Sequence, residues 1–297
     1  MNDESAAELP RVGFLGLGTM GAPMVLNLLH AGYSVVAYDK TAERVAACAD
    51  AGAVGAGSEE AVVERADVVM TSLPSSAVFV SVAEEHLVSR AREGQMFIDL
   101  GTTEAPETRR LAGEFARRGA SLLDVPVSGG RQGSETGSLR MFVGGDPEAA
   151  RQAMPLLHVL GDPERVVYCG PSGAGQVVKA VNQLAMGLAD AAYLEAVAFG
   201  VRSGAPPDAI AQAVGGDEGW RGQFGRIARR VAAGHGDDVL VKFPELRYSL
   251  AEAQTSGFSA PLLRALYAFC CQGEQAWRDN MGRPRPSLWH ELMNRPT

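Results

Sequence analysis

A lysine inside an apolar helical stretch is the first candidate for chemistry in this sequence. Lys179 has valine or alanine on both sides, and Asn182 and Gln183 follow it at spacings of three and four. These spacings place the three polar side chains on one face of a helix. Removal from water lowers the pKa of an ammonium group, so such a lysine becomes a better proton donor near neutral pH. The alternative is a lysine that extends along the helix surface into solvent and has no chemical role.

Polar residues also follow two apolar, strand-like runs. The first run ends in Asp124-Val125-Pro126-Val127-Ser128-Gly129-Gly130, where the Ser128 hydroxyl and the N–H groups of the glycines can hold a carboxylate. The second ends in Asp99-Leu100-Gly101-Thr102-Thr103, whose hydroxyls can reach a ligand. Open α/β sheets bind ligands at the carboxyl ends of their strands. The alternatives are a flexible turn after Val127 and helix capping by Thr102 or Thr103.

A glycine-rich turn near the start of the chain has the pattern of a dinucleotide-binding site. The stretch Gly16-Leu17-Gly18-Thr19-Met20-Gly21 follows an apolar run and precedes a helical pattern, and a second apolar run ends at Asp39. Gly16 permits the tight turn, Gly18 lets a pyrophosphate approach the backbone, and Gly21 lets the helix pack close to the strand. The N-terminus of the helix then faces the phosphates. The sequence therefore predicts that the chain binds a dinucleotide.

Asp39 bears on which dinucleotide is bound. A carboxylate at the end of the second strand accepts hydrogen bonds from the ribose hydroxyls and repels a 2′-phosphate, which favours NAD. Lys40 and Thr41 follow directly and favour a phosphate, so NADP stays an alternative. A third interpretation is that Asp39 only opens the turn before a helix over residues 41–51.

Composition limits the partners and the compartment. The 297 residues suffice for two cores, and the net charge of −8 argues against nucleic acid or an anionic membrane surface as a partner. The first five residues are polar and acidic, and no run has the apolar length of a membrane span, so we expect a cytoplasmic protein. The cysteines and histidines show no metal-ligand spacing, so we expect reduced thiols and no metal site.

The order of elements indicates a Rossmann-type doubly wound α/β sheet followed by an all-α domain. We expect a dinucleotide-binding domain over residues 1–173 and a helical substrate and dimerisation domain over residues 174–297. A long interdomain helix is expected from Ala174 to Ser203. The expected strands are 11–16, 34–38, 67–72, 96–100, 120–125, 139–144 and 165–169, and the expected helices between them are 20–31, 41–51, 77–91, 105–118 and 147–160.

From about residue 11 to about residue 290 the chain resembles the β-hydroxyacid dehydrogenases, the group that contains 3-hydroxyisobutyrate dehydrogenase and tartronate semialdehyde reductase. Five motifs in the same order are more specific than any one of them. The motifs that carry the resemblance are the Gly16–Gly21 turn with Ala22-Pro23-Met24, the pair Leu73-Pro74, Asp99-x-x-Thr102, Asp124-x-Pro126-Val127-Ser128-Gly129-Gly130, and Gly173-x-Gly175-x-x-x-Lys179-x-x-Asn182.

The resemblance implies roles for these residues. It implies that Lys179 is the catalytic acid/base, that Asn182 orients the substrate, and that Ser128, Gly129 and Gly130 hold the substrate carboxylate. It also implies that Thr102 helps to hold the nicotinamide half of the cofactor and that the Leu73-Pro74 pair contributes to cofactor binding. The helical domain, similar to the C-terminal domain of 6-phosphogluconate dehydrogenase, would close the site and form a homodimer or homotetramer.

The chain departs from the family pattern in the second half. Gly101 stands where the family often has serine, and Pro244 and Glu245 stand where it usually has Lys-Asp. Lys242 lies two residues before Pro244, so we take Lys242 and Trp220 as further substrate-binding candidates. The surroundings of Trp220 lack the serine-rich turn of the family, which leaves the identity of the substrate open.

The function predicted from these observations is hydride transfer between NAD(P) and a small 3-hydroxy acid or its semialdehyde. One alternative is an imine reductase of the same architecture, although the imine reductases that the chain resembles usually lack a lysine at the position of Lys179. A second alternative is a dinucleotide-binding module without catalysis, which would need neither Lys179 nor the Ser128–Gly130 turn.

Overall fold

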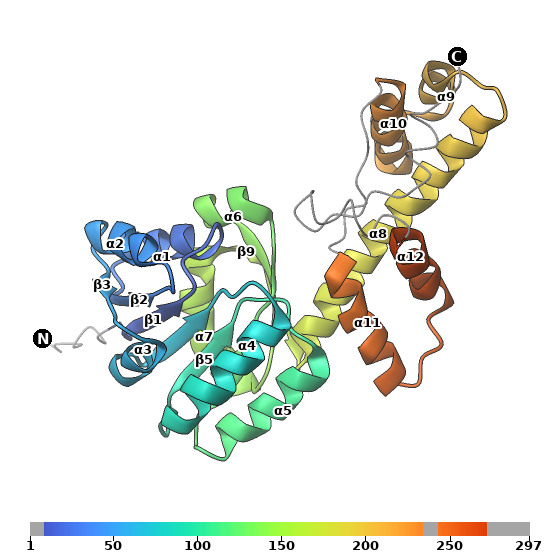
Figure 1. Cartoon of the computed structure of the whole chain (residues 1–297). Coiled ribbons are helices and arrows are strands. Elements are labelled where there is room, and N and C mark those ends of the chain that lie inside the picture. The colour runs from blue at the N-terminus through green and yellow to red at the C-terminus, as the bar shows by residue number, and fades with distance from the viewer. Residues whose placement is uncertain (1–8, 234–242, 272–297) are drawn as a thin grey trace, which may run out of the picture. The chain divides into compact units, whose positions relative to one another are not determined.

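The computed structural model describes residues 9–233 and 243–271. The chain falls into two compact units, Met1–Lys179 and Ala180–Thr297, whose boundary lies inside one long helix. Figure 1 shows a sheet with helices on both faces in the first unit, and the described part of the second unit contains helices alone. This arrangement confirms the predicted fold class, a doubly wound sheet followed by an all-α part.

The sheet of the first unit has nine strands, in the order β3-β2-β1-β4-β5-β6-β8-β7 with β9 beside β8. The first six strands of that order are parallel, and β8 runs antiparallel to β6 and β7. The order reverses between β1 and β4, which is where such sheets bind dinucleotides. The strands are β1 (Val12–Leu15), β2 (Val35–Tyr38), β3 (Val54–Gly55), β4 (Val68–Thr71), β5 (Met96–Asp99), β6 (Ser121–Asp124), β7 (Val127–Ser128), β8 (Leu139–Gly144) and β9 (Gly161–Gly170).

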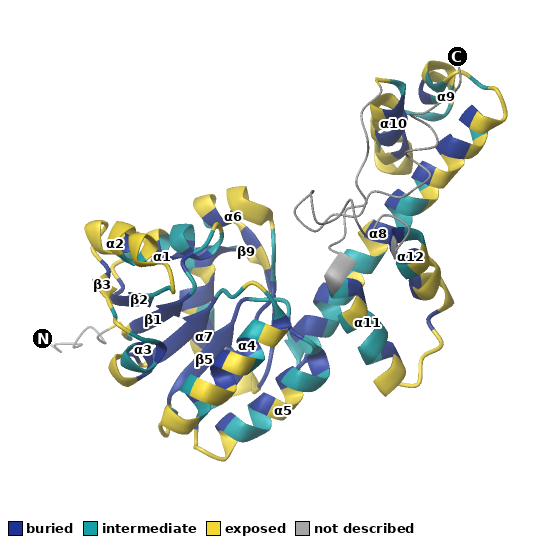
Figure 2. Ribbon diagram, viewed as in Figure 1, coloured by how far each residue is buried: buried dark blue, intermediate teal, exposed yellow. Residues whose placement is uncertain are grey.

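Helices cover both faces of this sheet because its strands are apolar on both sides. Neighbouring residues of one strand enter different cores: Phe14 packs in the core with Met24 and Leu28, whereas Leu15 packs in the core with Phe97. The dark blue strands of Figure 2 mark this burial. The covering helices are α1 (Gly21–His30), α2 (Ala42–Asp50), α3 (Glu59–Arg65), α4 (Ser76–Val82), α5 (Ala105–Ala116), α6 (Gly130–Thr136) and α7 (Pro147–Leu160).

Four short elements were not predicted: β3, α3, β7 and α6. Each has at most seven residues, too few for a clear hydrophobic period. The helix predicted over residues 77–91 is also divided, because α4 continues as a π-helical turn (Ala83–Leu87) and a 3₁₀ turn (Val88–Arg90). The helix predicted over residues 147–160 has those bounds in the structure.

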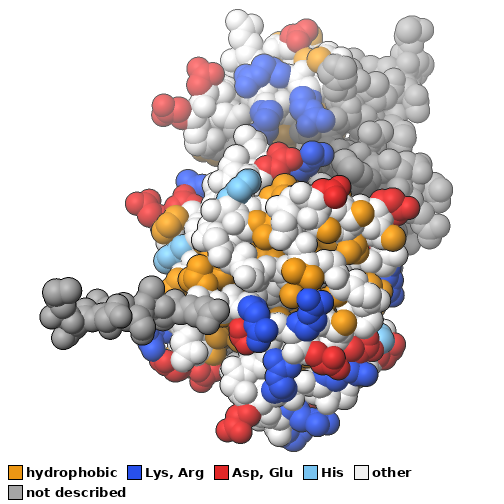
Figure 3. Space-filling model, turned by 90° about the vertical axis from the view of Figure 1, so that its left-hand side faces the viewer, with side chains coloured by type: hydrophobic (Ala, Val, Ile, Leu, Met, Phe, Trp, Pro, Cys, Tyr) orange, Lys and Arg blue, Asp and Glu red, His pale blue; other side chains and the backbone are white. Residues whose placement is uncertain are grey.

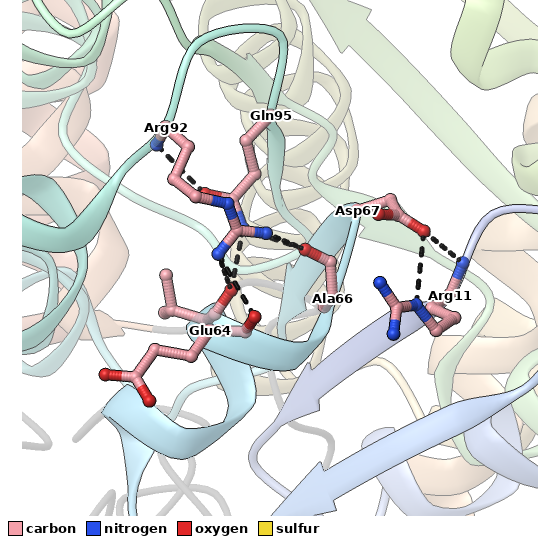
Figure 4. A network of polar contacts seen from close by, with 7 residues as sticks. Arg11, Glu64, Ala66, Asp67, Arg92 and Gln95 are labelled. Atoms are coloured by element: carbon pink, nitrogen blue, oxygen red, sulfur yellow. Dashed lines mark hydrogen bonds and ion pairs between the residues drawn. The ribbon is translucent and has the colours of Figure 1, made fainter.

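The end of α3 is closed by side chains from the loop before β5 (Figure 4). Arg92 donates from Nη1 to the carbonyls of Val63 and Glu64, at 3.1 and 3.2 Å, and from Nη2 to that of Ala66 at 2.9 Å. Gln95 is buried and donates to the Val63 and Ala66 carbonyls as well. The last carbonyls of a helix have no partner within it, so these contacts join α3 to the strand that follows the loop.

The second unit is built around α8 (Ala174–Arg202), whose 29 residues correspond to about 44 Å. One apolar cluster packs its C-terminal half against α9 (Pro207–Val214) and α10 (Gly219–Ala232), and another packs α8 against α11 (Phe243–Thr255) and α12 (Pro261–Cys271). Within residues 9–233 and 243–271, α8 alone is long and apolar enough to cross a membrane. The core helix of a soluble protein meets the same criterion.

The surface carries no single basic field on the face drawn in Figure 3. Lys and Arg side chains lie among Asp and Glu side chains there, with apolar side chains between them. This distribution agrees with the negative net charge of −8.

Candidate active site

The glycines of the turn between β1 and α1 have different structural roles. Gly16 has φ +92°, and a Cβ there would overlap the carbonyl oxygen of Ser72; a Cβ at Gly21 would overlap the carbonyl oxygen of Gly16. Packing of the chain therefore requires both glycines. A Cβ at Gly18 would have no described atom within 4 Å. The backbone beside Gly18 is thus open to an approaching group.

The start of α1 leaves backbone donors for an anion. No described group accepts from the N–H groups of Gly18, Thr19 or Met20. The helix has no side-chain cap at Met20 and no acidic residue in its first turn. Free N–H groups and the positive end of a helix bind phosphate, so this turn fits the pyrophosphate of a dinucleotide.

Asp39 ties the glycine turn to the end of β2. Its carboxylate accepts from the N–H of Leu17 at 2.7 Å and from the N–H of Thr41 at 2.8 Å, and Arg44 Nη1 lies 3.5 Å from both oxygens. Burial acts to raise the pKa of Asp39, but the hydrogen bonds from Thr41 and Leu17 and the Arg44 charge lower it overall. Asp39 therefore has the turn-forming role that was one of the interpretations of this residue, since it binds the backbone of both the glycine turn and the turn before α2. Since a carboxylate has about four acceptor positions, its predicted contact with a ribose is compatible with this role.

Leu73 lies against the same turn. It follows β4, and its Cδ2 would be 3.2 Å from a Cβ at Gly16. Pro74 is exposed next to it. The structure thus brings the Leu73-Pro74 pair to the glycine turn, although Leu73 is 57 positions after Gly16 in the sequence.

Asp99 organises the loop after β5. This buried carboxylate accepts from the Thr71 hydroxyl at 3.0 Å, from the Thr103 hydroxyl at 2.7 Å and from the N–H of Gly101 at 3.0 Å. Burial raises the pKa of Asp99, and these bonds offset part of the rise. Helix capping by Thr103 is wrong, because its hydroxyl binds Asp99 and α5 starts without a side-chain cap. Thr102 is half-buried in this fixed loop.

Asp124, at the end of β6, caps α8 from outside the helix. Its oxygens accept from the N–H of Gly173 at 2.8 Å and from the N–H of Gln176 at 3.0 Å. The residue before α8 is Gly173, which has no side chain to cap the helix. Burial raises the pKa of Asp124 to about 6 against these two hydrogen bonds, and the nearby Asp99 adds to the rise.

Lys179 is buried on the second turn of α8. The residue is only 7% exposed, so the alternative of a lysine that extends along the helix surface into solvent is wrong. Nζ donates to the carbonyl oxygen of Val127 at 2.6 Å. Val127 directly precedes Ser128, so the structure brings together the lysine and the Ser-Gly-Gly turn that the sequence presented as separate candidates.

The turn after Val127 needs its two glycines for conformational reasons. Gly129 has φ +137° and Gly130 has φ +60°, conformations that other residues rarely adopt. A Cβ at Gly130 would have no described atom within 4 Å. Ser128 is half-buried and both glycines are exposed. A hydroxyl and accessible backbone N–H groups therefore lie next to the carbonyl that Lys179 contacts.

The polar residues that follow Lys179 belong to the second unit. Asn182 is half-buried, and its Nδ2 lies 3.7 Å from the sulfur of Met186 on the same helix. The Gln183 amide donates to the carboxylate of Glu245 on α11. Gln183 therefore joins α8 to α11. This structural role accounts for a polar residue at position 183 without a part in catalysis.

Trp220 is on the first turn of α10 and is 51% exposed. Its ring meets Phe224 edge-on at a centroid distance of 6.4 Å, and the Arg221 guanidinium lies 4.6 Å from the ring centroid. Lys242, the other proposed substrate contact, lies outside the described residues.

One group of potential metal ligands was not predicted. Single ligand atoms of Glu59, Glu60 and His86 lie within 4.8 Å of one another. His86 Nδ1 is 2.7 Å from Glu60 Oε1, and Arg90 is 3.8 Å from the same oxygen. The contacts of Glu60 with the His86 and Arg90 side chains account for the grouping of these residues without a metal ion.

Comparison with known proteins identifies the family of this chain. Residues 11–170 match the model of the NAD binding domain of 6-phosphogluconate dehydrogenase, and residues 173–281 match that of the NAD-binding domain of NADP-dependent 3-hydroxyisobutyrate dehydrogenase. The 3-hydroxyisobutyrate dehydrogenase of Pseudomonas aeruginosa is 34% identical over 264 residues, which is 84% of this chain and 88% of that protein.

The chain belongs to the β-hydroxyacid dehydrogenase family.

Solved structures agree with this assignment. The Mycobacterium tuberculosis 3-hydroxyisobutyrate dehydrogenase, determined with L-serine, matches with a TM-score of 0.77 and 26% identity over 96% of this chain and 99% of that one. An imine reductase of Streptomyces aurantiacus matches with a TM-score of 0.61 and 24% identity over 96% and 100% of the two chains, a likeness of fold. This dehydrogenase is therefore an NAD(P)-dependent oxidoreductase, as predicted.

One departure of this dehydrogenase from the family pattern lies beside the buried carboxylate. A Cβ at Gly101 would lie 3.1 Å from Asp99 Oδ1, a close contact that a small shift of the side chain would relieve. At a second departure, Glu245 accepts from Gln183 and links α11 to α8.

Sequence reasoning missed Gln176 and the role of Asp124. Gln176 is 4% exposed and forms hydrogen bonds with backbone groups of the loop after β5. A lone amide in an otherwise apolar helical start was the available signal, but its partners lie more than 70 positions away.

Proposed function

We propose that this dehydrogenase interconverts a small 3-hydroxy acid and its semialdehyde with NAD(H), and that Lys179 is the general acid/base. The observation that supports this proposal most directly is the position of the Lys179 amine. It is buried and lies 2.6 Å from the carbonyl oxygen of Val127, the residue directly before Ser128. The names of the matched proteins support the substrate class, because 3-hydroxyisobutyrate and L-serine both carry a hydroxyl on the third carbon of a carboxylic acid.

Lys179 would supply the proton of the reduction. When an aldehyde becomes an alcohol, its carbon gains a hydride and its oxygen gains a proton. The ammonium group donates that proton to the carbonyl oxygen and takes it back in the oxidation direction. Its contact with the Val127 carbonyl fixes the direction of Nζ, while burial keeps competing water away from the amine.

The Ser128–Gly130 turn would hold the carboxylate of the substrate. Its hydroxyl and exposed N–H groups donate hydrogen bonds, and charge-assisted bonds of this kind are stronger than neutral ones. Lys179 contacts the residue before this turn, so a carboxylate held there would place the neighbouring carbons of a short substrate near Nζ. Asn182, three residues further along α8, is proposed to orient the substrate.

The glycine turn, Leu73-Pro74 and Thr102 would hold NAD, and Asp39 would accept from its adenosine ribose. Bound nicotinamide supplies and accepts the hydride. The lowered pKa of Asp39 keeps the carboxylate ionised, so a 2′-phosphate in its place would meet a negative charge. We propose NAD as the preferred cofactor, with NADP as the outcome that a cofactor comparison would test.

Residues 1–173 would form the dinucleotide domain and residues 174–297 the substrate and oligomerisation domain. We propose a homo-oligomer, supported by apolar side chains of α8 that are exposed in the single chain: Val181 (60%), Met186 (40%) and Phe199 (73%). A cytoplasmic location is proposed together with this function, and no nucleic acid, membrane or metal has a part in the proposed reaction.

The test is NADH oxidation with a panel of short semialdehydes, and the reverse reaction with 3-hydroxyisobutyrate and L-serine. Lys179→Ala is expected to lower turnover by about 10²-fold or more while NADH binding stays nearly unchanged. Lys179→Arg is the matched variant, because it keeps the charge but cannot release its proton at neutral pH. It should also be slow.

Four outcomes contradict the proposal in different ways. Turnover at the wild-type level in Lys179→Ala removes the lysine from the mechanism. Full turnover in Lys179→Arg shows that the charge matters and proton transfer does not. If the protein binds NADH and turns over a cyclic imine but no semialdehyde, it is an imine reductase. If it binds NADH and turns over neither class of substrate, it is a binding module.

A further inference from the structure

The side chain of Gln176 holds the loop after β5 on both sides of Thr102. Its Oε1 accepts from the N–H of Thr103 at 3.0 Å, and its Nε2 donates to the carbonyl of Gly101 at 3.0 Å. These two backbone groups flank the residue proposed to contact the nicotinamide half of the cofactor. An amide, with one acceptor and one donor group, is the side chain that matches this pair.

Gln176 is itself fixed at the start of α8. Its N–H donates to Asp124, which also accepts from Gly173. A Cβ at Gly175 would overlap the Phe142 carbonyl, and one at Gly144 would lie 2.6 Å from Asp124 Oδ1. The first turn of α8 therefore packs against the sheet more closely than other residues at these positions would allow.

Lys179 follows Gln176 by three residues, which is nearly one helical turn. One short piece of helix thus carries two groups, an amide that holds the Thr102 loop and an amine that contacts the residue before Ser128. Both contacts lie within the first unit.

We propose that Gln176 is a positioning residue that sets the distance between the Thr102 loop and the Lys179 amine. This rests on the proposed function, because the distance matters only if Thr102 orients the hydride carrier and Lys179 transfers the proton. Replacing the amide leaves the buried N–H of Thr103 and the partly buried carbonyl of Gly101 without this partner, so the loop would move. A displacement of about 1 Å at a reacting centre costs about 10²-fold in rate.

Two variants of similar side-chain length test the proposal. Gln176→Met keeps the length and removes both hydrogen bonds, and its kcat should fall by about 10- to 100-fold while the KM for NADH changes less than about threefold. Gln176→Glu keeps the acceptor for Thr103 but places a second oxygen against the Gly101 carbonyl when ionised. When protonated, its O–H replaces the lost donor.

The Gln176→Glu variant should therefore have a pH profile that a purely structural residue would not produce. Among the described residues, burial and the carboxylates of Asp99 and Asp124 raise the pKa of an introduced carboxyl. Lys179, one turn along, and Arg109, whose Nε would lie 3.0 Å from a Cβ at Gly173, act in the opposite direction. As the pH falls from 8 to 5.5, the ratio of wild-type kcat to Gln176→Glu kcat should decrease at least about tenfold. The ratio of wild-type kcat to Gln176→Met kcat should stay constant.

Each result has a separate meaning. Turnover within twofold of wild type in Gln176→Met, together with the expected loss in Lys179→Ala, overturns the positioning role and leaves the proposed function standing. A pH-independent ratio for Gln176→Glu also overturns it. If Gln176→Met does not fold, as judged by circular dichroism, the pH dependence of Gln176→Glu decides alone. Absence of wild-type turnover on every substrate overturns both proposals.

Discussion

Asp124→Asn is the substitution whose effect the structure predicts in most detail. The Asp124 carboxyl is 1% exposed, and its pKa rises from 3.8 to about 6, chiefly because burial disfavours the charged form. The folded protein therefore binds this proton more tightly than the unfolded chain does. A difference of about two pKa units corresponds to about 3 kcal/mol.

The sign follows from which state holds the proton. Between about pH 4 and pH 6 the folded state is the more protonated one, so the free energy of unfolding falls as the pH rises. The contribution is fully present below about pH 4 and is lost above about pH 6. An asparagine has no such titration, although its oxygen still accepts from one of the two N–H groups that Asp124 binds.

Urea unfolding followed by circular dichroism at pH 4, 5, 6 and 7 measures this difference. The free energy of unfolding of wild type relative to Asp124→Asn should decrease by about 3 kcal/mol over that range. Glu148→Gln is a useful control, because the pKa of Glu148 is lowered to about 2, first by its hydrogen bond with Arg151, which stays charged over this range. The Glu148 contribution is present above about pH 4.5, so the Glu148→Gln difference should be constant from pH 5 to 7. A constant Asp124→Asn difference would refute the reasoning.

Two further predictions concern the glycine turn. Asp39→Ala should lower the ratio of KM for NADPH to KM for NADH by about tenfold, since a charged acceptor is lost for the ribose and a repulsion is lost for the 2′-phosphate; an unchanged ratio would make Asp39 a turn residue only. Gly21→Ala should destabilise the protein by about 2 kcal/mol or more, because its Cβ overlaps the Gly16 carbonyl, as urea unfolding would show. Gly18→Ala should leave stability within about 0.5 kcal/mol but raise KM for NADH, and equal stability of the two variants would contradict the assigned roles.

The dinucleotide-binding domain is predictable because its sequence signature is local. Gly16, Gly18, Gly21 and Asp39 all belong to one strand–helix–strand unit, although the structure shows that Gly16 also packs against Ser72, which lies outside that unit. The fold class follows from the same alternation of apolar strands and amphipathic helices. The elements β3, β7, α3 and α6 escaped prediction because two or seven residues span too few repeats of the strand or helix period to show it.

The support of the candidate site was not predictable in the same way. Asp124 accepts from residues 49 and 52 positions later, and Gln176 binds a loop 73 to 75 positions earlier. Neither spacing has a local signature. Thr103 shows the cost of this limit: its position before α5 suggested a cap, whereas its hydroxyl binds the buried Asp99.

A buried carboxylate at the start of α8 is also a physical requirement of the arrangement. The first turn of α8 approaches β6 and β8 so closely that glycine is needed at Gly144 and Gly175, which leaves no side chain on the helix to accept its first N–H groups. An acceptor must therefore come from the sheet, and Asp124 supplies it. An asparagine would meet both N–H donors with only one acceptor atom. The raised pKa of Asp124 is the consequence of fixing, by this close packing, the helix that carries Lys179.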